Sequence, residues 1–133
     1  MSLVEFRSIS KIYGCGSGIT IALDKLDIVI NAGELVAVMG PSGSGKSTLL
    51  NIIGLLDKPT EGQYYLDGRD VTGFTKRKKA SLRNAWFGFV LQDFALIDDY
   101  TVCQNVKVPL DYAKISRKEK LNRIYSLLDM LGI

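Results

Sequence analysis

Residues 40–47 combine three glycines, three serines and one lysine in the order G-P-S-G-S-G-K-S. Gly43 and Gly45 allow backbone conformations that are closed to residues with a Cβ atom, so the N–H groups of the loop can curl around an anion. Lys46 can then reach the outer phosphates of a nucleotide, and the Ser47 hydroxyl can ligate Mg²⁺. These residue types in this order predict a phosphate-binding loop.

The segments on either side of this loop are the ones that such chemistry needs. Residues 35–39 (LVAVM) form a short apolar run, which predicts a buried parallel strand. Residues 47–56 are apolar and compatible with a helix, whose N-terminus adds unpaired N–H donors and a positive dipole potential. A glycine-rich turn without a ligand is the alternative. Lys46 argues against it, because a cation in the first turn opposes the helix dipole unless an anion sits there.

Composition excludes several classes of function. The chain has 133 residues, enough for one domain with a core, and its net charge of +3 is too mild to predict a nucleic-acid partner. No apolar run reaches the about 20 residues that span a bilayer, and the N-terminus lacks the features of a signal peptide. The absence of histidine excludes histidine-based catalysis. Cys15 and Cys103 lack metal-binding spacing and are expected to be reduced thiols of a cytosolic protein.

Several further strands are predicted around the loop. Alternating residues predict half-exposed strands at 4–8 and 26–30. The glycine-rich stretch 14–18 has no lysine and leads into a strand-like run, so it is predicted to be a hairpin connection and not a second phosphate loop. A short strand is expected at 63–66, followed by a tight turn at Asp67-Gly68.

The second half of the chain reads mainly as helices. Residues 75–84 predict a basic helix, which we interpret as a solvated face because the run is short and lacks interleaved aromatic residues. Residues 86–91 predict a second buried strand that delivers the polar Gln92 at its tip. The sequence S-R-K-E at 116–119 is a capping box that begins a helix, and Gly132 stands where that helix should stop.

From residue 4 to residue 133, the order of these features resembles the ATP-binding subunit of an ABC transporter. The similarity is greatest to the group that serves lipoprotein release, macrolide export and antimicrobial-peptide export. The segments that carry it are 11–14 (KIYG), 40–48, 49–62, 87–92, 101–106 (TVCQNV) and Pro109-Leu110. Two departures are small: Leu91 stands where phenylalanine is frequent, and Gln104 stands where glutamate is usual, which puts local ion pairing in doubt.

The resemblance implies an α/β fold with a P-loop NTPase core. An N-terminal antiparallel β region would occupy residues 1–34, the P-loop core 35–92 and the start of a helical subdomain 93–133. No Leu-Ser-Gly-Gly-Gln signature occurs in the chain, nor do the acidic strand end, the catalytic glutamate or the switch histidine of the family. The 133 residues are therefore expected to be a partial ATP-binding domain, truncated before the signature motif and equal to roughly its first half.

The resemblance also implies roles for individual residues. Tyr13 would stack on adenine, although a half-buried strand tyrosine is the alternative. Lys46 and Gln92 would have catalytic roles, and Ser47 and Gln92 would approach Mg²⁺. A surface polar residue is the alternative for Gln92. The residues implied to bind ATP are Tyr13, Gly40, Ser42, Gly43, Ser44, Gly45, Lys46, Ser47 and Thr48.

The function implied by the resemblance is ATP binding and hydrolysis that drive export through a transmembrane permease. A second ATP-binding subunit would complete the site, and residues 93–110 would face the permease. The protein would be cytoplasmic and peripheral at the inner face of the cell membrane, with no nucleic-acid partner. The alternatives are a soluble ABC-type ATPase of DNA repair or translation, and a fragment that binds nucleotide without hydrolysis. A P-loop GTPase is disfavoured because no Asn-Lys-x-Asp run occurs.

The missing half would have a structural consequence. In the family, the strands that correspond to 35–39 and 86–91 are not neighbours, because strands from the other half lie between them. Apolar strand edges would then remain unpaired, which costs backbone hydrogen bonds and exposes an adhesive edge. These edges lie at Val36, Val38, Phe87 and Phe89. We expect the chain to repack or to self-associate through them, and to show no ATP turnover.

Overall fold

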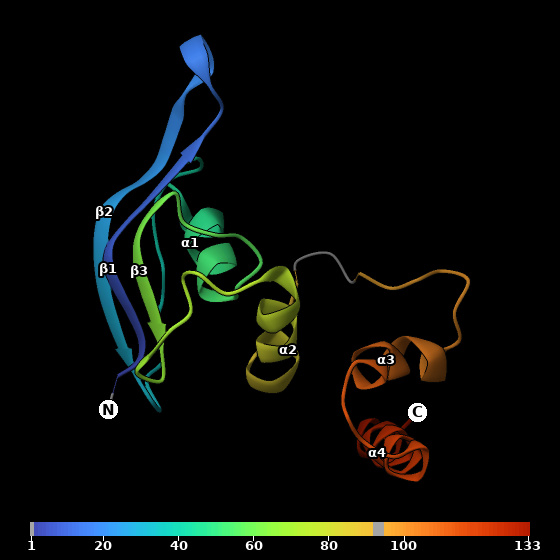
Figure 1. Cartoon of the computed structure of the whole chain (residues 1–133). Helices are drawn as coiled ribbons and strands as arrows, with labels where there is room; N and C mark the ends of the chain where they lie inside the picture. Colours follow the sequence, from blue (N-terminus) through green and yellow to red (C-terminus); the bar gives the residue numbers. More distant parts are fainter. Residues whose placement is uncertain (1, 92–94) are drawn as a thin grey trace. The chain divides into compact units, whose positions relative to one another are not determined.

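The computed structural model describes residues 2–91 and 95–133 (Figure 1). These residues divide into two compact units, the first ending at Ala80 and the second beginning at Ser81. Each unit is described by itself below. The subdivision at residues 34 and 92 that the family resemblance implies stays a prediction.

The first unit begins with a long antiparallel hairpin of β1 (Ser2–Tyr13) and β2 (Thr20–Asn31). The turn between them contains a short 3-10 helix at Gly16–Gly18, which confirms the predicted hairpin connection. The register shifts between Phe6 and Ile9, where Ser8 takes a φ of 50° and its N–H donates to the Asp27 carboxylate at 2.8 Å. A bulge of this kind bends a long strand and increases its twist.

Two shorter strands complete the sheet. Strand β3 (Glu61–Leu66) pairs antiparallel with β1, and β4 (Arg69–Asp70) pairs with β3, so the strand order is β2-β1-β3-β4. Asp67 and Gly68 have φ angles of 49° and 71°, and positive φ at both central residues is what a type I′ hairpin turn requires. The predicted strand and the predicted tight turn are both confirmed.

Helix α1 (Lys46–Ile53) lies beside this sheet (Figure 1). Its side chains Leu49 and Ile52 are buried. The ring of Tyr64 on β3 meets Phe6 edge to face, with the centroids 4.8 Å apart, and the Tyr64 hydroxyl donates to the Ile53 carbonyl at 2.7 Å. The buried apolar side chains of this unit are Val4, Phe6, Ile9, Leu23, Leu49, Ile52, Leu55, Tyr64, Leu66 and Val71.

The strand predicted at residues 35–39 is not formed, and that prediction is wrong for this structure. The segment has no regular secondary structure, and Leu35 is fully exposed while Val36, Val38 and Met39 are exposed as well. A buried parallel strand needs hydrogen-bonding neighbours and helices over both sheet faces. Among the described residues, the sheet consists only of β1 to β4, so nothing pairs with this segment.

The second predicted buried strand, at residues 86–91, is also wrong. Helix α2 (Lys76–Trp86) confirms the predicted basic helix but extends through Trp86. Residues 87–91 follow without strand structure; within them the rings of Phe87 and Phe89 stack on each other, with centroids 6.2 Å apart. The physical reason is the same as before, because the described residues offer this segment no strand to pair with.

The second unit contains helices α3 (Val102–Asp111) and α4 (Arg117–Leu131). Lys120 of α4 donates to the Asp111 carboxylate at 3.2 Å, and Asn84 at the end of α2 donates to the Pro109 carbonyl at 2.8 Å. On α4, Ile124 and Leu128 are buried. These contacts attach α4 and the end of α2 to the C-terminal part of α3.

The helix ends show where the capping predictions hold. Ser116 accepts a hydrogen bond from the Glu119 N–H, but the Glu119 carboxylate pairs with Arg123 at 2.6 Å, so the structure shows only the first half of that capping box. Gly132 ends the helix with a φ of 72°, as predicted. A complete capping box occurs at α3, where Gln104 bonds back to the Thr101 N–H. Gln104 therefore has a structural role through its side-chain oxygen.

Candidate functional site

The predicted phosphate loop precedes α1 directly, and the helix begins at Lys46 as the motif requires. Gly43 and Gly45 have φ angles of 81° and 88°, which side chains rarely allow. Gly45 also lies so close to the Ala22 carbonyl of β2 that a Cβ atom would overlap it. Glycine at position 45 is therefore required both by the backbone conformation and by the packing of the loop on the sheet.

The side chain of Lys46 lies over the loop. Its ammonium donates to the carbonyls of Gly40 and Pro41 at 2.9 Å and 2.6 Å, and it lies 3.4 Å from the Ser44 hydroxyl. The lysine is half-buried, while Ser47 in the next helical position is exposed. Lys46 and the Ser44 hydroxyl therefore lie close together at the N-terminal end of α1. The start of a helix offers N–H donors and a positive dipole potential, which suit a phosphate.

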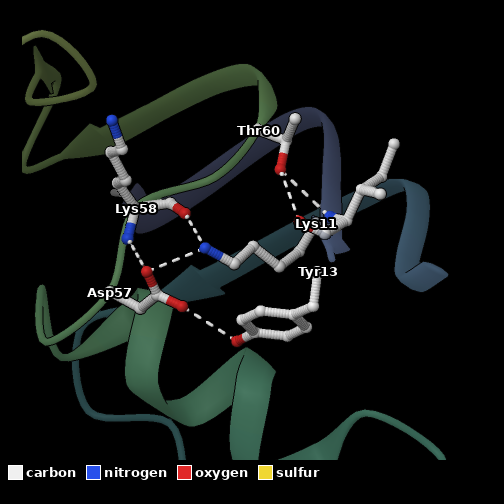
Figure 2. Close-up of polar contacts among 6 residues, drawn as sticks. Lys11, Tyr13, Asp57, Lys58 and Thr60 are labelled. Atoms are coloured by element: carbon white, nitrogen blue, oxygen red, sulfur yellow. Dashed lines mark hydrogen bonds and ion pairs between the residues drawn. The ribbon is translucent and has the colours of Figure 1, made fainter. Parts of the chain in front are cut away.

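Tyr13 lies at the end of β1 within the same unit, and it belongs to a cluster of polar contacts (Figure 2). Its hydroxyl donates to one Asp57 carboxylate oxygen at 2.8 Å, and the other oxygen accepts from Lys11 at 2.8 Å. The Lys11 ammonium also donates to the Lys58 carbonyl at 2.8 Å and lies 4.7 Å from the centroid of the Tyr13 ring. We call Lys11, Tyr13 and Asp57 the β1 clamp.

The charge state of the β1 clamp follows from its hydrogen bonds. Partial burial alone would raise the pKa of the Asp57 carboxyl, but the hydrogen bonds from Lys11, from the Lys58 N–H and from Tyr13 outweigh it and hold that pKa below its usual range. Lys11 is only 7% exposed, so its charge needs this nearby carboxylate. The clamp is therefore an ion pair between Lys11 and Asp57, and the Tyr13 hydroxyl is bonded to the same carboxylate.

The loop that follows α1 is fastened to β1 next to the clamp. The Thr60 hydroxyl accepts from the Ile12 N–H at 3.0 Å and lies 3.4 Å from the Ile12 carbonyl (Figure 2). The Thr60 N–H donates to the Ser10 carbonyl at 2.8 Å. Through these bonds Thr60 pairs with the edge of β1, and they fix the position of the segment that carries Asp57.

Most, but not all, of the predicted site residues lie in one unit of the structure. The first unit contains the whole phosphate loop and Tyr13, whereas Gln92 lies outside the described residues. Ser42, Ser44 and Ser47 are exposed, and Thr48 is half-buried. Among the described residues, no group of three or more acidic or cysteine side chains is placed to hold a metal ion.

Sequence reasoning did not assign roles to Lys11 and Asp57. A signal for Lys11 was present, because residues two apart on a strand lie on the same face, and Lys11 stands two residues before Tyr13. Asp57 carried no comparable signal. Its contact with Lys11 joins residues 46 positions apart, and a carboxylate in a turn is usually solvated.

Known proteins are similar to this chain over nearly its whole length. The family described as ABC transporter matches residues 23–133. An uncharacterized ABC transporter ATP-binding protein of Bacillus subtilis, YvrO, is 43% identical over 98% of the chain, and the chain spans 57% of its length. The macrolide export ATP-binding/permease protein MacB of Salmonella typhimurium is 44% identical over 99% of the chain, which spans 20% of that protein.

Solved structures of ATP-binding cassettes are also similar to this chain. The dimeric ATP-binding cassette MJ0796, in a post-hydrolysis state bound to ADP and Pi, superposes with a TM-score of 0.84 at 40% identity. The match covers 98% of this chain and 57% of the cassette. The chain therefore spans somewhat more than half the length of such cassettes, and its backbone superposes on the corresponding part.

Proposed function

Because the chain belongs to the ABC transporter family, we propose that it is the ATP-binding part of a transporter that exports its substrate. The observation that carries this proposal is the loop at residues 40–48, where Lys46 is the first residue of α1 and its ammonium lies over the loop carbonyls. The relatives described as ATP-binding proteins support the same conclusion. What is exported depends on contacts outside these residues.

The residues of this chain fit Mg²⁺-ATP. The N–H groups at the start of α1 and the ammonium of Lys46 match the charge of the phosphates, and the exposed Ser47 hydroxyl is a suitable Mg²⁺ ligand. Tyr13 offers an accessible aromatic ring for adenine, and Gln92 is proposed to approach Mg²⁺ and the attacking water. When bound, Mg²⁺ neutralises charge on the phosphates, while the loop residues bind and orient them. The proposed ATP-binding residues are Tyr13, Gly40, Ser42, Gly43, Ser44, Gly45, Lys46, Ser47 and Thr48.

Substitution of Lys46 tests the proposal. Lys46→Ala removes a charge-assisted contact worth about 1.5–3 kcal/mol, so we expect the affinity for ATP to fall about ten- to a hundred-fold. Titration with a fluorescent ATP analogue measures this. Lys76→Ala, at an exposed position of the same unit, is the matched control and should leave the affinity unchanged. Equal affinities in the wild type and Lys46→Ala would contradict the role of the lysine.

Binding without turnover is the second candidate function, and one observation favours it for this chain. The 133 residues contain neither the signature sequence nor a glutamate placed after an acidic strand end. We expect the chain by itself to bind ATP and to release no phosphate above background. A phosphate-release assay decides this, because steady release that Lys46→Ala abolishes would assign hydrolysis to the chain.

The proposed partners are a transmembrane permease and a second ATP-binding subunit. One relative is described as an ATP-binding/permease protein, and the solved cassettes are dimeric. None of the helices in the described part of the chain has the length and apolar character needed to cross a bilayer. We propose a cytoplasmic site at the inner face of the cell membrane, with residues 93–110 facing the permease. Co-purification with ribosomes or DNA would favour the soluble ABC-type ATPases instead.

A further inference from the structure

The ring of Tyr13 is accessible and yet held in place. It is 41% exposed at the end of β1, where its backbone pairs with Thr20 of β2. An exposed tyrosine without polar partners samples several rotamers, and ordering it costs conformational entropy. Here Asp57 holds the hydroxyl and Lys11 lies over the ring (Figure 2). The ring therefore has one preferred direction before any ligand arrives.

We propose that Asp57 is a positioning residue for base recognition, which holds Tyr13 and Lys11 as a preformed platform for a purine. This inference rests on the proposed nucleotide site and deepens it. A platform ordered in advance saves the binding reaction the entropy of ordering it. Because the Lys11 ammonium covers one face of the ring, the base stacks on the opposite face.

Helix α1 connects this platform to the phosphate loop. The helix begins at Lys46, and beyond its last residue the N–H groups of Leu56 and Asp57 both donate to the Asn51 carbonyl, at 2.8 Å and 3.1 Å. These bonds fix Asp57 to the C-terminal end of the helix. One rigid element thus carries the phosphate-binding group at its start and the group that orients the stacking ring at its end.

The carboxylate of Asp57 has no substitute in the cluster. It accepts hydrogen bonds from Lys11, from the Lys58 N–H at 2.7 Å and from Tyr13, so each of these donors depends on it. Without it, Lys11 keeps the Lys58 carbonyl but loses its counter-charge, and the Tyr13 hydroxyl loses its acceptor. The expected result is a Tyr13 ring that is no longer oriented, while the phosphate loop stays unchanged.

Two ligands, ATP with a base and inorganic tripolyphosphate without one, distinguish binding through the base from binding through the phosphates. We would measure the affinities of ATP and of inorganic tripolyphosphate by competition against a fluorescent ATP analogue, using the 133-residue chain. Asp57→Ala should weaken ATP about three- to ten-fold and tripolyphosphate less than two-fold. Tyr13→Phe keeps the ring and removes only the hydroxyl. It should lower the ratio of the affinity for ATP to the affinity for tripolyphosphate by a similar factor.

A double-mutant cycle then tests whether the two residues act together. If Asp57 acts through the Tyr13 hydroxyl, adding Asp57→Ala to Tyr13→Phe should lower the ratio by less than a further two-fold. Thermal unfolding of each variant reports whether the fold is intact. If Asp57→Ala fails to fold, Tyr13→Phe alone decides, and an unchanged ratio in that variant overturns the inference.

The other outcomes are distinguishable from failure of the proposed function. Equal losses for ATP and tripolyphosphate in Asp57→Ala would assign Asp57 to the fold alone and overturn the inference. A wild-type chain that binds tripolyphosphate as tightly as ATP would overturn it too, while the phosphate-loop proposal would stand. A wild-type chain that binds neither ligand contradicts both.

Discussion

Strand β1 (Ser2–Tyr13), which mixes apolar and polar residues, and the wholly apolar segment 35–39 lie in the same unit, but their surroundings differ completely. Strand β1 pairs with β2 on one side and β3 on the other, and its Phe6 is only 1% exposed. Residues 35–39 pair with no strand of the described chain, and Leu35 is fully exposed. Hydrophobic composition alone therefore does not decide which of the two is buried.

The difference lies in where the partner strands come from. Antiparallel neighbours can be joined by a short turn, and β2 follows β1 after only a few residues. A buried parallel strand has to obtain its neighbours through long crossovers, and it needs helices over both sheet faces. Strand β1 finds both partners within the first unit. The segment 35–39 would need strands that the described residues do not supply.

The largest expected effect tests this comparison in the sheet core. Phe6→Ala leaves a cavity beside Tyr64, and we expect it to lower the free energy of unfolding by about 3–5 kcal/mol. Leu35→Ala also truncates an apolar side chain, but at a fully exposed position. It should change the free energy of unfolding by less than about 0.5 kcal/mol. Urea unfolding followed by circular dichroism measures both. Similar losses in the two variants would show that residues 35–39 are buried in solution.

The next effect concerns how the paired strands hold α1. Tyr64→Phe keeps the ring but removes the hydroxyl that donates to the Ile53 carbonyl, and we expect a loss of about 1–2 kcal/mol. Tyr65→Phe, at the adjacent, half-buried position of β3, is the matched control and should be nearly neutral. The same urea titration applies. A neutral Tyr64→Phe would mean that the buried hydroxyl does not contribute to the attachment of the helix.

Much of the first unit could be predicted because its signals are local. Alternation around Phe6 predicted β1, the Asp67-Gly68 pair predicted the turn after β3, and the glycine pattern with Lys46 predicted a loop at a helix start. In the second unit, the turn chemistry of Gly132 predicted the end of α4. Each of these features is decided by residues close together in the sequence.

The features that could not be predicted depend on distant residues. The pairing of residues 35–39 depends on strands elsewhere, so an apolar run could not show whether they would be present. The contact of Lys11 with Asp57 joins a strand to a loop 46 positions later, and no short pattern contains both. One missed feature is local, because the capping box of Thr101 and Gln104 joins residues only three positions apart.

The smallest expected effect on stability concerns the exposed segment itself, and it completes the comparison. Val36→Lys and Val38→Lys place charges on residues that are exposed and that pair with no strand in the described part of the chain, so no buried contact is lost there. We expect the free energy of unfolding to change by less than about 0.5 kcal/mol in the double variant.

Unpaired apolar edges promote association, and inserted lysines oppose it. Light scattering against protein concentration should therefore show less self-association in the double variant than in the wild type. A loss of more than about 1 kcal/mol would place the two valines in a core, and equal association in both proteins would assign the contact to another surface.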